Sequence, residues 1–128
     1  MRSIAVTFSR AILLLIVATQ CAAADNAVPD FTKDVAPIFA KYCVGCHNGT
    51  DREGDLSLET FADMQKGGGR GAAFVPGRAD ASLLVRALAS EVEPAMPPED
   101  NERPTAKEIA TLRAWIDAVI ATAGRRRR

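Results

Sequence analysis

Residues 41–49 read KYCVGCHNG and contain the pattern Cys-x-x-Cys-His at Cys43, Cys46 and His47. The chain has 128 residues with three cysteines and one histidine, so this stretch holds two of the cysteines and the single histidine. The chemistry that such a pattern indicates depends on the compartment, because thiols stay reduced in the cytosol and become covalently linked outside it. The segment before the pattern decides the compartment.

The first 24 residues have the three parts of a bacterial secretory signal peptide. Arg2 and Arg10 give a basic start, residues 11–18 form an apolar run, and the alanines at 22–24 form a small-residue cleavage site. The apolar run is shorter than the roughly 20 residues that a membrane-spanning helix needs. We therefore predict that residues 1–24 are removed and that the mature protein is periplasmic or secreted.

Cleavage after Ala24 leaves residues 25–128, which suffice for one small domain. It also removes Cys21, so that Cys43 and Cys46 are the only cysteines left. A lipoprotein with an acylated Cys21 is the alternative, but Gln20 is bulky and polar where a small residue is expected. We predict a folded domain over residues 25–124, followed by a basic tail.

Charge is segregated along the mature chain, which keeps 14 basic and 16 acidic side chains and has a formal net charge of −2. Four of the bases form the tail Arg125, Arg126, Arg127 and Arg128, without which the body has a net charge of −6. Such a terminal block is usually a solvated end. Its functional alternative is contact with an acidic partner or with anionic lipid head groups. The acidic body and the secretion signal argue against nucleic acid as a partner.

Apolar residues recur at helical spacing in several segments, and strand signals are absent, so we predict an all-α fold. The last helix has a capping box at Thr105 and Glu108 and a stop at Gly124. Asp34 is the expected cap of the first helix, and Asp80 that of the third. The expected helical segments are 34–47, 57–68, 79–90 and 103–124. Aromatic residues make up only 5% of the chain, so we expect these helices to pack around a large apolar group.

Four kinds of site use a Cys-x-x-Cys-His pattern or part of it. A thioredoxin-like dithiol needs a βαβ context that the helical pattern does not offer, and a zinc site needs a fourth ligand beyond Cys43, Cys46 and His47. A lone disulfide would close a very small ring, whereas secreted domains stapled by disulfides usually carry several. The fourth kind is covalent attachment of one haem c, with thioethers at both cysteines and His47 as the proximal iron ligand. We favour haem for two reasons. Two thiols one turn apart can react with the two vinyl groups of one porphyrin, and the haem is a large apolar group that would complete the hydrophobic core.

A second axial ligand would come from a methionine, since the mature chain has no second histidine. Met96 lies in EPAMPPED, residues 93–100, where three prolines stiffen the backbone 49 residues beyond His47. Met64 lies at helical spacing from Phe61 and is the better candidate for core packing. We therefore predict Met96 as the distal iron ligand.

Several other features have both a functional and an ordinary interpretation. Residues 65–77 are glycine-rich but lack the ending and the preceding strand of a phosphate loop. Within this segment or just after it, Arg70 or Arg78 could pair with a haem propionate, and Pro76 or a backbone carbonyl could hold the His47 ring. Acidic side chains flank Met96 and could steer a basic partner, although a solvated loop is the more common outcome; they are Glu91, Glu93, Glu99, Asp100 and Glu102.

Taken together, residues 30–49, residues 54–88, PAMPP at 94–98 and EIATLRAWIDAV at 108–119 resemble the planctomycete-type cytochrome c domain. The resemblance covers most of residues 30–120 and lies within the wider superfamily of small all-helical cytochromes c. It implies a haem c domain whose first and last helices pack against each other beside one covalently attached haem. It also implies thioether roles for Cys43 and Cys46 and axial roles for His47 and Met96.

From these features we expect a monomeric mono-haem electron carrier that passes single electrons between redox proteins and is not itself an enzyme. Two strong axial ligands would leave no open position for a substrate. The first alternative is a haem domain with a labile sixth site that acts as a gas sensor or a peroxidase-like protein. The second is a haem-containing subunit of a larger dehydrogenase.

Overall fold

The computed structural model describes residues 27–125. The predicted signal peptide, Cys21 and the arginines at 126–128 lie outside the described residues. Between residues 27 and 125 the chain forms helices, short helical turns and loops, with a single isolated bridge between Gly68 and Gly71 and no strand. The prediction of a small all-α fold is thus confirmed. In the same part of the chain, no helix combines the length and the hydropathy of a membrane-spanning segment.

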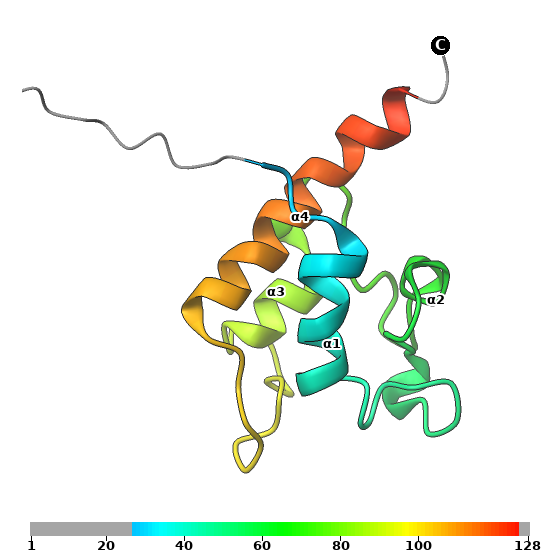
Figure 1. Ribbon diagram of the computed structural model, residues 1–128. Coiled ribbons are helices and arrows are strands. Elements are labelled where there is room, and N and C mark those ends of the chain that lie inside the picture. The colour runs from blue at the N-terminus through cyan, green and yellow to red at the C-terminus, as the bar shows by residue number, and fades with distance from the viewer. Residues whose placement is uncertain (1–26, 126–128) are drawn as a thin grey trace, which may run out of the picture.

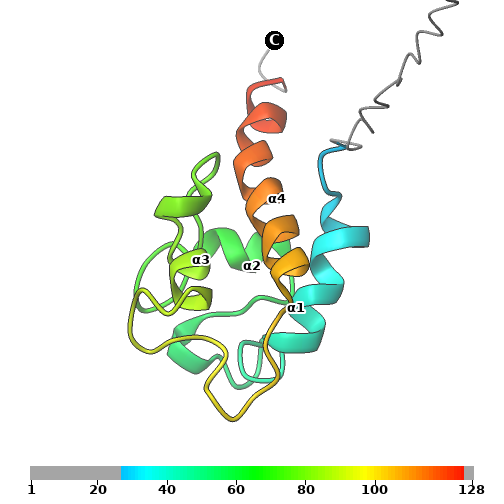
Figure 2. The same ribbon diagram turned by 90° about the vertical axis from the view of Figure 1, so that its left-hand side faces the viewer.

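Within residues 27–125, four α-helices and three short turns of π or 3-10 type follow one another (Figure 1). In chain order they are η1 (Phe31–Val35), α1 (Ala36–Tyr42), η2 (Glu53–Asp55), α2 (Phe61–Lys66), η3 (Ala79–Ala81), α3 (Leu83–Leu88) and α4 (Ala106–Arg125). The first helical segment, η1 with α1, lies beside α4 in both views (Figures 1 and 2). The expected packing of the first and last helices is therefore present.

The N-cap of the first helical segment lies four residues before the predicted one, Asp34. Asp30 is the N-cap, and its carboxylate accepts a hydrogen bond from the amide of Lys33 at 2.9 Å. Asp34 instead lies in the first turn and accepts a hydrogen bond from the amide of Asp30 at 2.7 Å. The two aspartates thus satisfy amides on both sides of the helix start.

The third predicted helix is interrupted at Ser82, which is fully buried and has an extended backbone between η3 and α3. Its hydroxyl donates a hydrogen bond to the carbonyl of Arg78 and accepts one from the amide of Val75, both at 2.9 Å. These bonds satisfy polar groups of the preceding loop, which a continuous helix could not do. Asp80, the predicted cap, instead pairs with Arg113 of α4.

Helix α4 begins as predicted and ends later than predicted. Glu108 accepts a hydrogen bond from the amide of Thr105 at 2.7 Å, and Thr105 Oγ1 accepts one from the amide of Glu108 at 3.2 Å. This is the expected capping box. Gly124 does not end the helix, which continues through it to Arg125.

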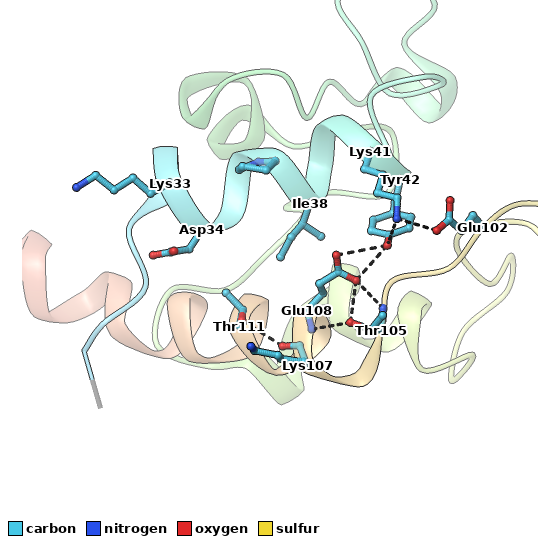
Figure 3. A pocket seen from close by; sticks show the side chains of 11 residues that line it. Lys33, Asp34, Ile38, Lys41, Tyr42, Glu102, Thr105, Lys107, Glu108 and Thr111 are labelled. Atoms are coloured by element: carbon cyan, nitrogen blue, oxygen red, sulfur yellow. Dashed lines mark hydrogen bonds and ion pairs between the residues drawn. The ribbon is translucent and has the colours of Figure 1, made fainter. Parts of the chain in front are cut away.

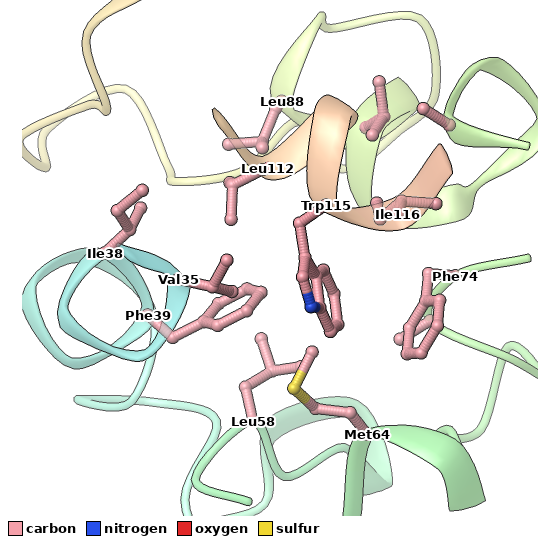
Figure 4. Packing of buried hydrophobic residues seen from close by; sticks show 13 residues of the cluster. Val35, Ile38, Phe39, Leu58, Met64, Phe74, Leu88, Leu112, Trp115 and Ile116 are labelled. Atoms are coloured by element: carbon pink, nitrogen blue, oxygen red, sulfur yellow. The ribbon is translucent and has the colours of Figure 1, made fainter. Parts of the chain in front are cut away.

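A buried apolar cluster joins the helices, with Trp115 of α4 at its centre (Figure 4). The indole is 5% exposed, and its centroid lies 5.5 Å from that of Phe31, 6.0 Å from Phe61 and 5.2 Å from Phe74. Met64 is 1% exposed in the same cluster, so its predicted packing role is confirmed. One aromatic side chain thus connects η1, α2 and α4.

Candidate functional site

A cavity of about 600 Å³ opens between the end of α1, the loop after it, the glycine-rich segment, α3 and the proline-rich loop. Cys43, Cys46, His47 and Met96 all line it. The loop after α1 and the proline-rich loop lie at the same end of the molecule in both views (Figures 1 and 2). The fold thus brings together the four site residues predicted from the sequence.

The Cys-x-x-Cys-His segment continues the end of α1 as a tight turn. The carbonyl of Cys43 accepts hydrogen bonds from the amides of Cys46 and His47, at 3.2 and 2.9 Å. Cys43 is half-buried, whereas Cys46 is exposed, and both are free thiols. Burial raises the pKa of the Cys43 thiol to about 11. The turn therefore presents two thiols to one cavity in different surroundings.

The ring of His47 is fixed by the loop that follows it. Its Nδ1 lies 2.8 Å from the carbonyl oxygen of Glu53. A carbonyl can only accept, so Nδ1 must carry the proton and donate it, which leaves the Nε2 lone pair available to a metal. The main chain of His47 is held as well, because its carbonyl accepts a hydrogen bond from the amide of Leu58 at 2.8 Å. Of the two acceptors expected for the ring, a backbone carbonyl or Pro76, the structure shows a backbone carbonyl, that of Glu53.

Asn48 organises the turn directly after His47. Its side-chain oxygen accepts hydrogen bonds from the amides of Thr50 and Asp51, both at 2.8 Å, and its Nδ2 donates to the carbonyl of Val44 at 3.1 Å. Asparagine commonly makes such local bonds in turns. The role of Asn48 was not predicted, although an Asn-Gly pair such as Asn48 and Gly49 is a recognisable turn signal in a sequence.

The glycine-rich segment packs against the loop that supports His47. The amide of Gly69 donates to the carbonyl of Gly54 at 2.8 Å. A Cβ atom on Gly68 would lie 2.7 Å from the same carbonyl oxygen and 2.9 Å from Leu56 Cβ, so only glycine allows this approach. Arg70, exposed in this segment, lines the cavity, whereas Arg78 precedes η3 and is not part of the cavity wall.

Met96 reaches the cavity from the loop between α3 and α4. Its amide donates a hydrogen bond to the carbonyl of Ala87 at 3.0 Å, which attaches the loop to the end of α3. Ala87 and Leu88 line the same cavity, so Met96 is fixed next to one of its walls. The remaining wall is largely aliphatic and includes Leu56, Leu58 and Leu84.

Comparison with protein families gives one match over this geometry. Residues 43–100 match the family model described as planctomycete cytochrome C, a range that includes both cysteines, His47 and Met96. Over this range the chain is similar to the planctomycete cytochrome C family. No curated protein and no solved structure matches the chain.

Similarity to a cytochrome c family over residues 43–100 suggests a haem-binding, electron-transfer role. The residues around the cavity fit that cofactor. Two thiols, an imidazole with its Nε2 free and a thioether are the donor types that haem c uses. The cavity volume also lies within the roughly 300–1,000 Å³ of ordinary cofactor sites.

A second, shallow groove of about 530 Å³ lies between the first helical segment and the start of α4 (Figure 3). Here Lys41 Nζ donates to the Tyr42 hydroxyl at 2.8 Å and to Glu102 at 2.7 Å, and the hydroxyl donates to Glu108 at 3.1 Å. The hydrogen bonds to Glu102 and then to Tyr42 raise the pKa of Lys41. The polar groups at the centre of the groove thus bind one another, and we assign them a structural role in the domain.

The capping box predicts a pH-dependent stability. The amide and then the hydroxyl of Thr105, with a smaller contribution from Tyr42, lower the pKa of Glu108 below its ordinary 4.5. A lowered pKa gives a stabilisation that is complete above the ordinary value and is lost as the pH falls through the folded-state value. We expect Glu108→Gln to lower the free energy of unfolding at neutral pH and to match the wild type in acid, where Glu108 is itself neutral.

Urea unfolding of both proteins at neutral pH and well below pH 4.5 measures this difference. Glu99→Gln is the control, because Glu99 is an exposed acid outside any helix cap. A Glu108→Gln deficit that persists unchanged in acid would contradict the prediction.

Proposed function

We propose that residues 25–124 form a periplasmic or secreted mono-haem cytochrome c that carries single electrons between redox proteins. The observation that carries the proposal is the convergence of Cys43, Cys46, His47 and Met96 on one largely aliphatic cavity. Its support from comparison is the family match over residues 43–100. The chain acts as a carrier and not as an enzyme.

Each of the four residues has one role in this proposal. Cys43 and Cys46 hold the porphyrin through thioether bonds, His47 is the proximal ligand and Met96 the distal ligand. A haem bound in this way supplies a one-electron ferric/ferrous couple, and methionine ligation raises its potential relative to two histidines. The Glu53 carbonyl keeps the His47 ring in one tautomer and orientation.

Charged side chains around the cavity suggest which residue would pair with the cofactor and what kind of partner protein would bind. Arg70 is the cavity-lining arginine and is the better of the two candidates for pairing with a haem propionate. The exposed acids around Met96 favour a basic redox partner, through long-range attraction that speeds encounter. We propose a monomer whose arginine tail contacts anionic lipid head groups or an acidic partner.

Substitution of Met96 tests the proposal. The mature chain, residues 25–128, is produced with a bacterial periplasmic haem-attachment system, and oxidised and reduced spectra are recorded with and without carbon monoxide. The wild type should be low-spin, show the far-red methionine-to-iron band and ignore carbon monoxide. Met96→Ala should lose the band, bind the gas and have a potential lower by on the order of 0.1 V, within the roughly 0.8 V that axial ligands span.

Met64→Leu is the matched control, because Met64 is a buried core methionine and its replacement should keep both the band and the closed site. A wild type that binds carbon monoxide readily would contradict firm Met96 ligation. That outcome would favour the gas-sensing or peroxidase-like alternative.

A further inference from the structure

The loop that carries Met96 is tied to the fold by the side chain of Arg103. Arg103 Nη2 donates to the carbonyl of Leu88 at 2.8 Å and to that of Met96 at 3.2 Å, and Nη1 donates to the carbonyl of Pro97 at 2.8 Å. One guanidinium therefore bonds the end of α3 and two consecutive carbonyls of the loop. Arg103 was not singled out from the sequence, since its partners are main-chain atoms 6 to 15 residues away.

These bonds complete the attachment of Met96 to the cavity wall. The Met96 amide already bonds directly to the carbonyl of Ala87. Through Arg103, the carbonyl of Met96 is joined to that of Leu88, the next residue of the same helix. The amide of Met96 is thus bonded directly to Ala87, and its carbonyl is linked through Arg103 to Leu88. Both of these α3 residues line the cavity.

We propose that Arg103 is the positioning residue for Met96 and holds its thioether at the distal position of the cavity. The proposal rests on the function proposed above, in which Met96 is an iron ligand. Arg103 acts only through the main chain of the loop. Without it, Met96 keeps its own amide bond but loses the restraint on its carbonyl side, and the thioether spends more time away from the iron.

The chemistry of arginine suits this role better than that of lysine. Three carbonyls need donors pointing in different directions from one plane, which a guanidinium provides and a single ammonium does not. Hydrogen bonds from a charged donor are also stronger than neutral ones. The other side-chain bond of this part of the loop, from Lys41 Nζ to Glu102, is a single contact between two exposed side chains and involves no carbonyl near Met96, so it is expected to restrain Met96 much less.

The effect is expected on the equilibrium between bound and displaced Met96. Loss of two or three charge-assisted hydrogen bonds should raise the displaced fraction by roughly tenfold or more. In Arg103→Gln the far-red methionine-to-iron band should weaken, and carbon monoxide should bind the ferrous protein faster by the same factor. The midpoint potential should fall toward that of Met96→Ala. A residue needed only for folding would not move these three readouts in a folded protein.

The test compares mature holoproteins that carry Arg103→Gln, Arg103→Lys, Met96→Ala or Arg86→Gln. Arg86→Gln is the matched control, because Arg86 is an exposed arginine of α3 that pairs with Glu91 rather than with the carbonyls beside Met96. The proposal is supported when both Arg103 variants keep the helical circular dichroism of the wild type but weaken the band and bind carbon monoxide faster than Arg86→Gln. Arg103→Lys retains the charge, so its defect would isolate the loss of hydrogen-bond geometry.

Two outcomes overturn the proposal while leaving the proposed function in place, because Met96→Ala still loses the band. In one, the Arg103 variants match Arg86→Gln in band, gas binding and potential. In the other, even Arg103→Lys loses its helical signal, which would make Arg103 a folding residue. The proposed function itself fails, and the inference with it, when the wild type lacks the band and Met96→Ala changes nothing.

Discussion

Replacement of both Cys43 and Cys46 by alanine is expected to abolish covalent haem attachment and to leave the mature chain without its compact fold. The two thiols line a cavity of about 600 Å³ with largely aliphatic walls. Without the cofactor these apolar walls would be exposed to water, which is unfavourable in proportion to the apolar area exposed. The cavity should therefore collapse or fill with water.

Intact mass under denaturing conditions measures the attachment, and circular dichroism measures the helices. The wild-type mature chain should carry the mass of one haem, and the double variant should have the mass of the polypeptide alone with much reduced helical signal. Thr50→Ala, at an exposed position of the same loop, is the control and should behave like the wild type. A wild-type chain without added mass, made in a cell that matures other cytochromes, would refute the haem c assignment.

Replacement of Trp115 by alanine is expected to be the most destabilising single change in the core, at about 3–5 kcal/mol. The indole is 5% exposed and meets three phenylalanine rings at centroid distances of 5.2 to 6.0 Å. Its removal detaches α4 from the rings of η1 and α2, which remain joined to each other through Phe31 and Phe61, at a centroid distance of 5.8 Å. For a domain of this size, each kcal/mol lowers the melting temperature by roughly 4–8 °C, so a fall of at least about 12 °C should follow.

Urea and thermal unfolding of the holoproteins measure this loss. Val28→Ala removes an exposed apolar side chain, 61% accessible, and should change the free energy of unfolding by no more than about 0.5 kcal/mol. Trp115→Phe should fall between these two, because a smaller ring keeps part of the packing. A Trp115→Ala deficit below about 1 kcal/mol would mean that the aromatic cluster does not hold the helices together.

The sequence allowed the helical class, the capping box and the four cavity residues to be predicted, because each has a local signal. Hydrophobic spacing identifies a helix, and T-x-x-E identifies its start. Cys43, Cys46 and His47 form one contiguous motif, and Met96 is the methionine that prolines flank on both sides. The cavity that joins these two segments could be expected only from the chemistry of the motif and from the family resemblance.

The features that escaped prediction depend on contacts between main-chain atoms or on a choice between equivalent residues. Asp30 and Asp34 are both good caps, and only the tertiary position of η1 decides between them. The break at Ser82 depends on a carbonyl and an amide of the preceding loop, which have no sequence signature. The same holds for the Glu53 carbonyl at His47 and for the three carbonyls at Arg103.

The bonds made by Arg103 also have an evolutionary consequence. All three acceptors are carbonyls of the main chain, which every amino acid possesses. The tether therefore depends on the path of the loop and makes no demand on the side chains at positions 88 and 97. Substitutions among the exposed acids of the loop, such as Glu93, Glu99 and Asp100, can accumulate without weakening it. Lineages can thus adapt this face to new partners while Met96 stays in place, provided that the arginine is kept.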